Sequence, residues 1–230
     1  MKAQEKGSEQ PKSPYREYAE SIIIAIVLAL IIRAFVVQAF KIPSGSMEDT
    51  LLIGDHILVN RFAYGIQIPF TEFKLHFFGL LGIPARQDIV VFPFPRDPSR
   101  DFIKRVVGLP GERVEVHNHE VYVNGEPLKE PYVKLEEQGP PRASPYRNWG
   151  PSVVPPGKLF VMGDNRDNSA DSRDWGFLDI EKVKGRAFII YWSWDGSAPK
   201  LVWLGGIPLP NPKAILLDGI RWGRIGKLLQ

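Results

Sequence analysis

The 230-residue sequence contains no cysteine. A disulfide bond, a thiolate nucleophile and a cysteine-bound zinc ion are therefore excluded, because each needs a thiol group. The sequence also lacks a strong excess of one charge: 29 lysine and arginine residues oppose 26 aspartate and glutamate residues, for a net charge of +3. Because the basic residues are scattered rather than gathered in one stripe, nucleic acid is not an expected partner.

Only one long apolar run interrupts a composition that is otherwise typical of a globular protein, with 44% hydrophobic residues. Residues 21–40 carry a single charge, Arg33, over about the 20 residues needed to cross a bilayer. An arginine near one end of such a helix can extend its guanidinium to the interface. The sequence therefore predicts one transmembrane helix over residues 21–40. The basic N-terminal segment, residues 1–20, is then cytoplasmic, and residues 41–230 form an extracytoplasmic domain.

Two other interpretations of the apolar run stay open. A cleavable signal peptide would also pair an apolar stretch with preceding basic residues. A buried core helix is the second alternative, although the run is apolar on all sides rather than along one stripe.

Beyond the apolar run, short segments rich in β-branched and aromatic residues dominate. Turns containing glycine, proline or asparagine separate them, including Asn124-Gly125, and no long helical period intervenes. We therefore expect a mostly β, antiparallel catalytic domain. Residues 63–86 and 137–157 are expected to be loop or hairpin insertions, and the apolar stretch 63–83 either packs in the core or contacts the membrane. The expected strands are residues 55–60, 88–92, 102–107, 113–117, 120–124, 158–162 and 186–192.

Two segments carry residues suited to nucleophilic catalysis. Ser46 lies in the segment PSGSM, directly after the apolar run, and Lys104 lies among apolar residues in FIKRVV. If Lys104 faces an apolar environment, its pKa falls and the neutral amine can act as a general base. A plain turn at Ser46 and an exposed strand charge at Lys104 are the alternatives.

A third segment, GDNRDNSADSRDWG at residues 163–176, is dense in short polar side chains. A calcium-binding loop fits poorly, because Ser172 and Leu178 would replace its glycine and its bidentate glutamate; a structural turn stays open. The four histidines, at positions 56, 76, 117 and 119, form no familiar triad or metal set. No cofactor or metal is expected.

Taken together, PSGSM, GDHILVNRFAYG, DIVVF with FIKRVVGLPGE, and GDNRDNSADSR with WGF resemble the bacterial type I signal peptidases, in order and in separation. The resemblance implies a membrane-bound serine endopeptidase that removes N-terminal signal peptides from exported preproteins, cleaving after a small residue. It implies Ser46 as nucleophile and Lys104 as general base, with the Ser44 hydroxyl and the Ser46 N–H as the oxyanion hole. Ser169 would orient the lysine, and Asp171, Arg173 and Arg105 would form a supporting ion-pair network.

The resemblance also implies where the substrate binds and where the enzyme works. The first pocket would use Ile42, Met47, Leu51, Phe102 and Ile103, the second Phe40, Val91 and Ile103, with Pro43 also in the substrate site. Partners would be preproteins and membrane lipid, at the bacterial cytoplasmic membrane. Two departures from the family pattern are a single spanning segment and Glu48-Asp49 in place of a proline, so the turn after the nucleophile is expected to be less rigid.

Two rival functions remain at this stage. A self-cleaving repressor shares the serine and lysine pair but needs a DNA-binding domain, and none precedes Ser46 in this sequence. A membrane-tethered β module that only binds peptides or lipid headgroups would use the same motifs as structural turns. Loss of processing in Ser46→Ala, with folding intact, separates enzyme from module.

Overall fold

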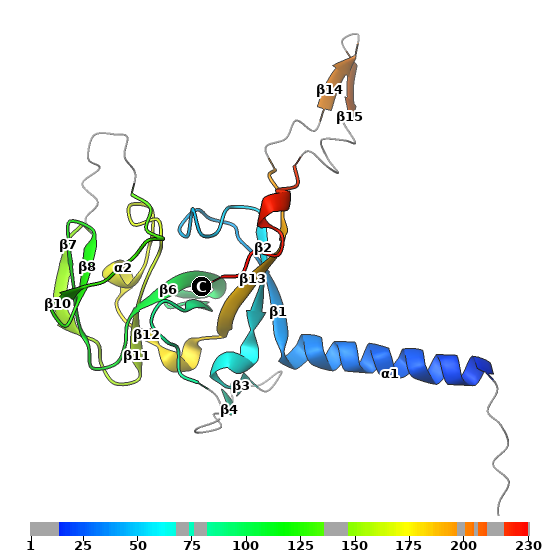
Figure 1. Ribbon diagram of the computed structural model, residues 1–230, viewed down its shortest axis with the longest axis horizontal. Helices are drawn as coiled ribbons and strands as arrows, with labels where there is room; N and C mark the ends of the chain where they lie inside the picture. The colour runs from blue at the N-terminus through cyan, green and yellow to red at the C-terminus, as the bar shows by residue number, and fades with distance from the viewer. Residues whose placement is uncertain are drawn as a thin grey trace, which may run out of the picture.

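The structure is a computed structural model with a long N-terminal helix and a β-rich domain (Figure 1). It describes residues 14–67, 74–75, 82–135, 147–196, 201–204, 207–210 and 219–229.

The N-terminal helix α1 runs from Pro14 to Phe35 and projects away from the β domain (Figure 1). Proline suits the first position of a helix, and an ion pair of 2.9 Å between Arg16 and Glu20 supports the first turns. The helix begins before the predicted range of residues 21–40 and ends within it, so the predicted C-terminal end is wrong. Residues 37–40 belong instead to strand β1 (Val37–Lys41), because they pair with β2 (Asp55–Asn60).

The predicted membrane-spanning helix is likewise not confirmed. Within the residues described above, no helix has both the length and the apolar character needed to cross a bilayer.

The main sheet has seven strands in the order β1-β2-β13-β5-β6-β11-β12. Its pairings are antiparallel, so the predicted mostly β, antiparallel class is confirmed. The remaining strands of this sheet are β5 (Ile89–Phe94), β6 (Asp97–Gly108), β11 (Lys158–Met162), β12 (Leu178–Asp179) and β13 (Gly185–Ser193).

A second sheet has four strands in the order β10-β7-β8-β9. The turn between β7 (Arg113–His117) and β8 (Glu120–Val123) is separate from the predicted Asn124-Gly125 turn, which joins β8 to β9 (Glu126–Pro127). Asn124 and Gly125 both have positive φ, 55° and 86°, as a tight hairpin turn requires. The fourth strand, β10 (Trp149–Val153), falls inside the expected insertion 137–157.

The other described elements are short. Two small hairpins are formed by β3 (Ile66–Gln67) with β4 (Lys74–Leu75) and by β14 (Leu201–Leu204) with β15 (Ile207–Pro210). The expected insertion 63–86 contains the first hairpin, but residues 68–73 and 76–81 lie outside the described residues, as do 137–146 of the second insertion. The short helices are η1 (Arg61–Tyr64), α2 (Ser172–Trp175), η2 (Ile180–Lys182) and η4 (Trp222–Arg224).

Strand β6 matters most for the site, because its second half is buried on both faces. Ile103, Val106 and Val107 enter three different core clusters, and every residue from Ile103 to Gly108 is buried. Antiparallel strands usually expose one face, but here β5 and β11 flank the strand while core clusters cover both sides. Any polar side chain in this half of β6 is therefore removed from water.

Candidate active site

The buried half of β6 brings a lysine against a serine. Ser46 lies in the nucleophile loop, which we define as residues 42–54, between β1 and β2. The Lys104 amine donates to Ser46 Oγ at 2.7 Å and to the Ile103 carbonyl at 2.8 Å. Lys104 is 3% exposed and Ser46 is 9% exposed. Lys104 is therefore a buried amine in contact with a hydroxyl, and the exposed-charge interpretation is wrong.

Burial changes the protonation of this amine. It lowers the pKa of Lys104 from 10.5 to about 8, even though the charges of Asp171 and Asp164 act to raise it. A neutral amine has a lone pair that can accept the Ser46 proton. The site therefore contains a poor nucleophile next to a base that is partly unprotonated near neutral pH.

We predict that activity rises with pH through the Lys104 pKa of about 8. Below that pH the protonated amine predominates, so kcat/KM should increase about tenfold per pH unit and level off above it. Stability should change in the same direction: the folded-state pKa lies below the unfolded value of 10.5, so the folded protein gains stability as pH rises between the two values. A kcat/KM profile that stays flat from about pH 6 to about pH 10 would contradict this role of Lys104.

The nucleophile loop is anchored at its C-terminal end by Asp55, which is fully buried. Its carboxylate accepts hydrogen bonds from Leu52 N at 2.8 Å, Ser193 Oγ at 2.6 Å and Arg224 Nη2 at 2.5 Å. Burial alone would raise the pKa of Asp55, but the hydrogen bonds lower it below its ordinary value. An ionised carboxylate therefore ties the loop to β13 and to the C-terminal segment.

Gly163, which directly follows β11, lies against the nucleophile loop at Ser46. A Cβ at this position would lie 2.5 Å from the Ser46 carbonyl oxygen and 2.2 Å from Ser169 Oγ. Only glycine fits between the two serines without a shift. The sequence predicts that Ser169 bonds to Lys104, yet its hydroxyl is buried without a hydrogen-bond partner among the described residues. Among the described residues the Lys104 amine donates to Ser46 and Ile103, and the role of Ser169 in orienting the lysine stays a prediction.

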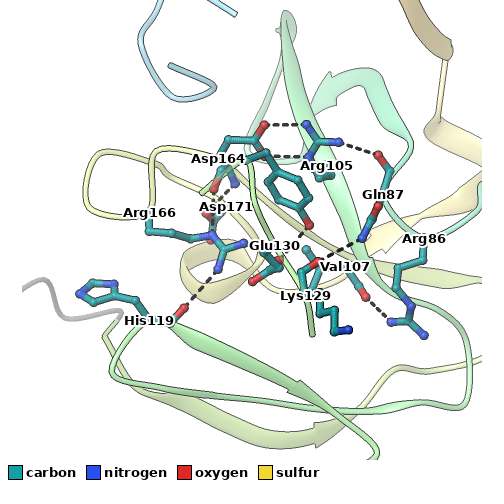
Figure 2. Close-up of polar contacts among 12 residues, drawn as sticks. Arg86, Gln87, Arg105, Val107, His119, Lys129, Glu130, Asp164, Arg166 and Asp171 are labelled. Carbon is teal, nitrogen blue, oxygen red and sulfur yellow. Dashed lines mark hydrogen bonds and ion pairs between the residues drawn. The ribbon is translucent and has the colours of Figure 1, made fainter. Parts of the chain in front are cut away.

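Two buried ion pairs surround the dyad. Arg105 Nε and Nη2 donate to Asp164 at 2.9 and 2.8 Å (Figure 2). The Arg105 guanidinium also lies 3.8 Å from the centre of the Tyr132 ring. Arg173 donates to both oxygens of Asp171 at 2.8 Å. The structure therefore places the three predicted network residues in buried pairs, as bidentate contacts that a lysine could not reproduce.

Sequence reasoning missed the partner of Arg105, since Asp164 was not among the predicted site residues. It also missed Arg166, which is buried and donates to Glu130 at 2.6 Å and to the His119 carbonyl at 3.2 Å (Figure 2). The alternating acids and bases of residues 163–173 gave a usable signal, because buried charges need partners.

A cavity of about 620 Å³ opens at the dyad. Pro43, Phe102 and Ile103 line it as predicted, and so does Ser44. The other predicted wall residues are placed differently: Ile42, Met47, Leu51 and Val91 are buried in the core, with Phe40 packed against them. Of these five, Ile42, Met47, Leu51 and Val91 lie in the core, whereas Phe40 is partly buried. Among the described residues, the lining consists of Pro43, Ser44, Gly45, Ser46, Arg100, Asp101, Phe102, Ile103, Lys104, Asn168 and Ala170.

A serine hydroxyl in contact with a desolvated lysine, at the end of a cavity, is the arrangement of a serine peptidase that uses lysine in place of histidine. Residues 15–192 match the family described as "Signal peptidase, peptidase S26". The chain belongs to this signal peptidase family.

Individual relatives agree with this assignment. The chain is 38% identical to "Signal peptidase I" of Pseudomonas aeruginosa over 212 residues, which cover 77% of this chain and 72% of the relative. It is 41% identical to "Signal peptidase I" of Leptolyngbya laminosa, with 80% and 83% covered. The relative from Aquifex aeolicus, also named "Signal peptidase I", is 33% identical, with 93% and 98% covered.

One solved structure is also similar in sequence. It is the crystal structure of a signal peptidase I from Enterococcus faecalis, 36% identical, covering 45% of this chain and 95% of that chain, with a TM-score of 0.39.

Proposed function

We propose that this signal peptidase removes signal peptides from preproteins with Ser46 as the nucleophile and Lys104 as the general base. The observation that supports these roles is the 2.7 Å contact between a lysine that is 3% exposed and the Ser46 hydroxyl. Because the amine is held by burial in β6 and the hydroxyl by the nucleophile loop, the pair is preorganised before substrate arrives.

The reaction follows from this contact. Lys104 Nζ takes the Ser46 proton while Oγ attacks the scissile carbonyl carbon, and the carbonyl oxygen becomes negatively charged. The Ser46 N–H and the Ser44 hydroxyl belong to two residues that line the cavity, and they would stabilise that oxygen. Lys104 then gives the proton to the leaving amine, which leaves an ester on Ser46. Water, activated by the same lysine, hydrolyses this ester and releases the signal peptide.

Strand β6 has an edge beside Ser46 and Lys104 to which a substrate can bind. Strand β6 pairs with β5 from Asp97 to Arg105, but among the described strands its pairing with β11 covers only Arg105 to Gly108. Residues 101–104 therefore keep one side available, and Asp101 to Lys104 also line the cavity. An extended peptide can add to such an edge and place its scissile bond at Ser46.

We predict cleavage after a small residue that follows another small residue two positions earlier. Phe102 and Ile103 close the cavity beside the dyad, so replacing the final small residue of a precursor by tryptophan should lower kcat/KM by about 100-fold or more. Processing of purified precursor by the full-length protein in detergent, with mass spectrometry of the cut, measures this. Ser46→Ala is the control and should give no product. Efficient cleavage of the tryptophan precursor would contradict the pocket.

We also propose that α1 attaches the enzyme to the bacterial cytoplasmic membrane, with the catalytic domain on the extracytoplasmic side. Six apolar side chains of this helix are between 49% and 66% exposed: Ile22, Ile23, Ile24, Ile26, Val27 and Leu28. An exposed apolar surface of this kind favours contact with lipid. The full chain should float with phosphatidylglycerol-containing vesicles, whereas Ile23→Lys with Val27→Lys should not. Equal flotation of both would exclude α1 as the attachment.

A further inference from the structure

The nucleophile loop contains a peptide unit whose orientation the proposed mechanism requires but does not yet explain. Ser46 N–H is the backbone donor of the proposed oxyanion hole, and it belongs to the same planar unit as the Gly45 carbonyl. In a trans peptide the C=O and N–H groups lie in one plane and point in opposite directions. Whatever holds the Gly45 oxygen therefore also fixes the direction of the Ser46 N–H.

Two donors hold that oxygen. The Asn165 side-chain amide donates to Gly45 O at 3.2 Å, and Glu48 N–H donates to it at 3.0 Å. The backbone N–H of Asn165 donates in addition to the Ser46 carbonyl at 3.2 Å. Asn165 thus contacts the carbonyl groups on both sides of the Ser46 N–H.

Asn165 is itself held firmly. It is 1% exposed and forms a parallel bridge with Lys134, whose N–H donates to the Asp164 carbonyl at 2.9 Å and whose carbonyl accepts from Arg166 N at 3.2 Å. The side chain is therefore presented from a fixed backbone, as a positioning group requires.

The chemistry of its neighbours sets the direction of the Asn165 amide. Nδ2 lies 3.2 Å from Gly45 O and 3.4 Å from Glu48 Oε2, and both of these atoms are acceptors. The opposite orientation would place the amide oxygen against two acceptors, so the NH2 group must face the loop. In return, Asn165 Oδ1 is buried without a hydrogen-bond partner among the described residues, an unfavourable arrangement that the contact with Gly45 requires.

The residues that depart from the family pattern complete this arrangement. Glu48 Oε2 lies 3.5 Å from Lys134 Nζ, and Asp49 Oδ1 lies 3.6 Å from the same atom. Asp49 adopts a positive φ of 77°, a conformation that proline cannot adopt. The turn after the nucleophile therefore has side-chain contacts to Lys134 where the family pattern has a proline ring, and its lower rigidity stays a prediction.

We propose that Asn165 is a positioning residue that aims the Ser46 N–H at the developing oxyanion, an inference that rests on the proposed roles of Ser46 and Lys104. Removal of the Asn165 amide leaves Gly45 O with the Glu48 N–H as its donor, and because Gly45 has no Cβ, the peptide unit between it and Ser46 can then rotate further than in the wild type. Rotation would turn the donor away from the oxyanion, while Ser46 Oγ, Lys104 and the substrate cavity keep their places. The loss then falls on the transition state and not on substrate binding.

The experiment compares Asn165→Ala with wild type in the full-length, detergent-solubilised enzyme. We expect kcat on a purified precursor to fall about 10- to 100-fold, with KM within about twofold. The pKa seen in the kcat/KM profile should not move, since the dyad is unchanged. A peptide aldehyde that forms a tetrahedral adduct with Ser46 should lose affinity by the same factor as kcat/KM, whereas the cleaved signal peptide should bind as before.

A merely structural role gives a different pattern, and any of its signs would overturn the inference: unchanged aldehyde affinity, an increased KM or a displaced pKa. Asn148→Ala is the matched control, because Asn148 caps Asn118 N in the second sheet, away from the loop. If Asn165→Ala fails to fold, Asn165→Asp tests the same contact, because it keeps the size of the side chain but replaces the NH2 group that donates to Gly45 O by a carboxylate oxygen. It should lower kcat and aldehyde affinity about three- to tenfold together, and wild-type aldehyde affinity would refute the proposal. Retained cleavage by Ser46→Ala would instead refute the proposed function.

Discussion

Lys104→Arg is expected to cleave precursor at least about 10,000-fold more slowly than wild type, close to the level of Ser46→Ala. The substitution keeps a positive charge and nearly the same length. The lysine amine has a pKa of about 8, because burial lowers it. The arginine guanidinium that replaces it does not deprotonate in proteins. If the charge alone mattered, activity would survive, so the variant separates a general base from an electrostatic support.

The control for Lys104→Arg is the same substitution at another lysine of the main sheet. Lys158→Arg changes a lysine on β11 that pairs with Asp179 at 2.6 Å and is 37% exposed, so near-wild-type activity is expected. Arg105→Lys is unsuitable as a neutral control, because it would break the bidentate contact with Asp164. Rates should be measured after circular dichroism has shown each variant to be folded. A vigorous Lys104→Arg enzyme would mean that another group is the base.

The fold was predictable wherever its signals are local. All seven predicted strands are present, because β-branched residues and flanking turns mark each one within a few positions. Residues 37–40 were assigned wrongly because their apolar side chains suit a helix as well as a strand, and only the distant pairing with β2 decides. Strand β10 was missed for a similar reason: Gly150 and Pro151 predict a loop, but β7 supplies its partner.

The site divides in the same way. Ser46 and Lys104 could be proposed from their motifs, whereas the burial that lowers the pKa of Lys104 depends on core clusters on both faces of β6. The contacts of Asn165 could not be predicted from the sequence, because the Gly45 carbonyl that its side chain contacts lies 120 positions away. The predicted pocket walls stay a prediction: Met47 and Leu51 are buried in the core, because an apolar residue next to a motif can also pack into the core.

Gly163→Ala should lower kcat/KM by about 100- to 1,000-fold, the second largest effect that we expect. The new methyl group would lie 2.5 Å from the Ser46 carbonyl oxygen and 2.2 Å from Ser169 Oγ, far inside contact distance. Neither Gly163 nor the Ser46 carbonyl can move without breaking a hydrogen bond. Gly163 N–H donates to the Asp171 carboxylate at 3.0 Å, and the Ser46 carbonyl accepts from Asn165 N–H at 3.2 Å. Relief of the clash must therefore shift Ser46 relative to Lys104, and a displacement of about 1 Å costs about 100-fold in rate.

Gly223→Ala is the matched control, because a Cβ there meets nothing within 4 Å and the backbone has no positive φ. It makes the same chemical change at an open position, so its activity and melting temperature should stay near those of wild type. In Gly163→Ala the melting temperature should also fall, since overpacking a buried site costs about 1 to 3 kcal/mol. Activity measured well below the new melting temperature isolates the geometric effect. Full activity there would show that the loop absorbs the methyl group and that the approach of Gly163 to Ser46 does not set the geometry of the dyad.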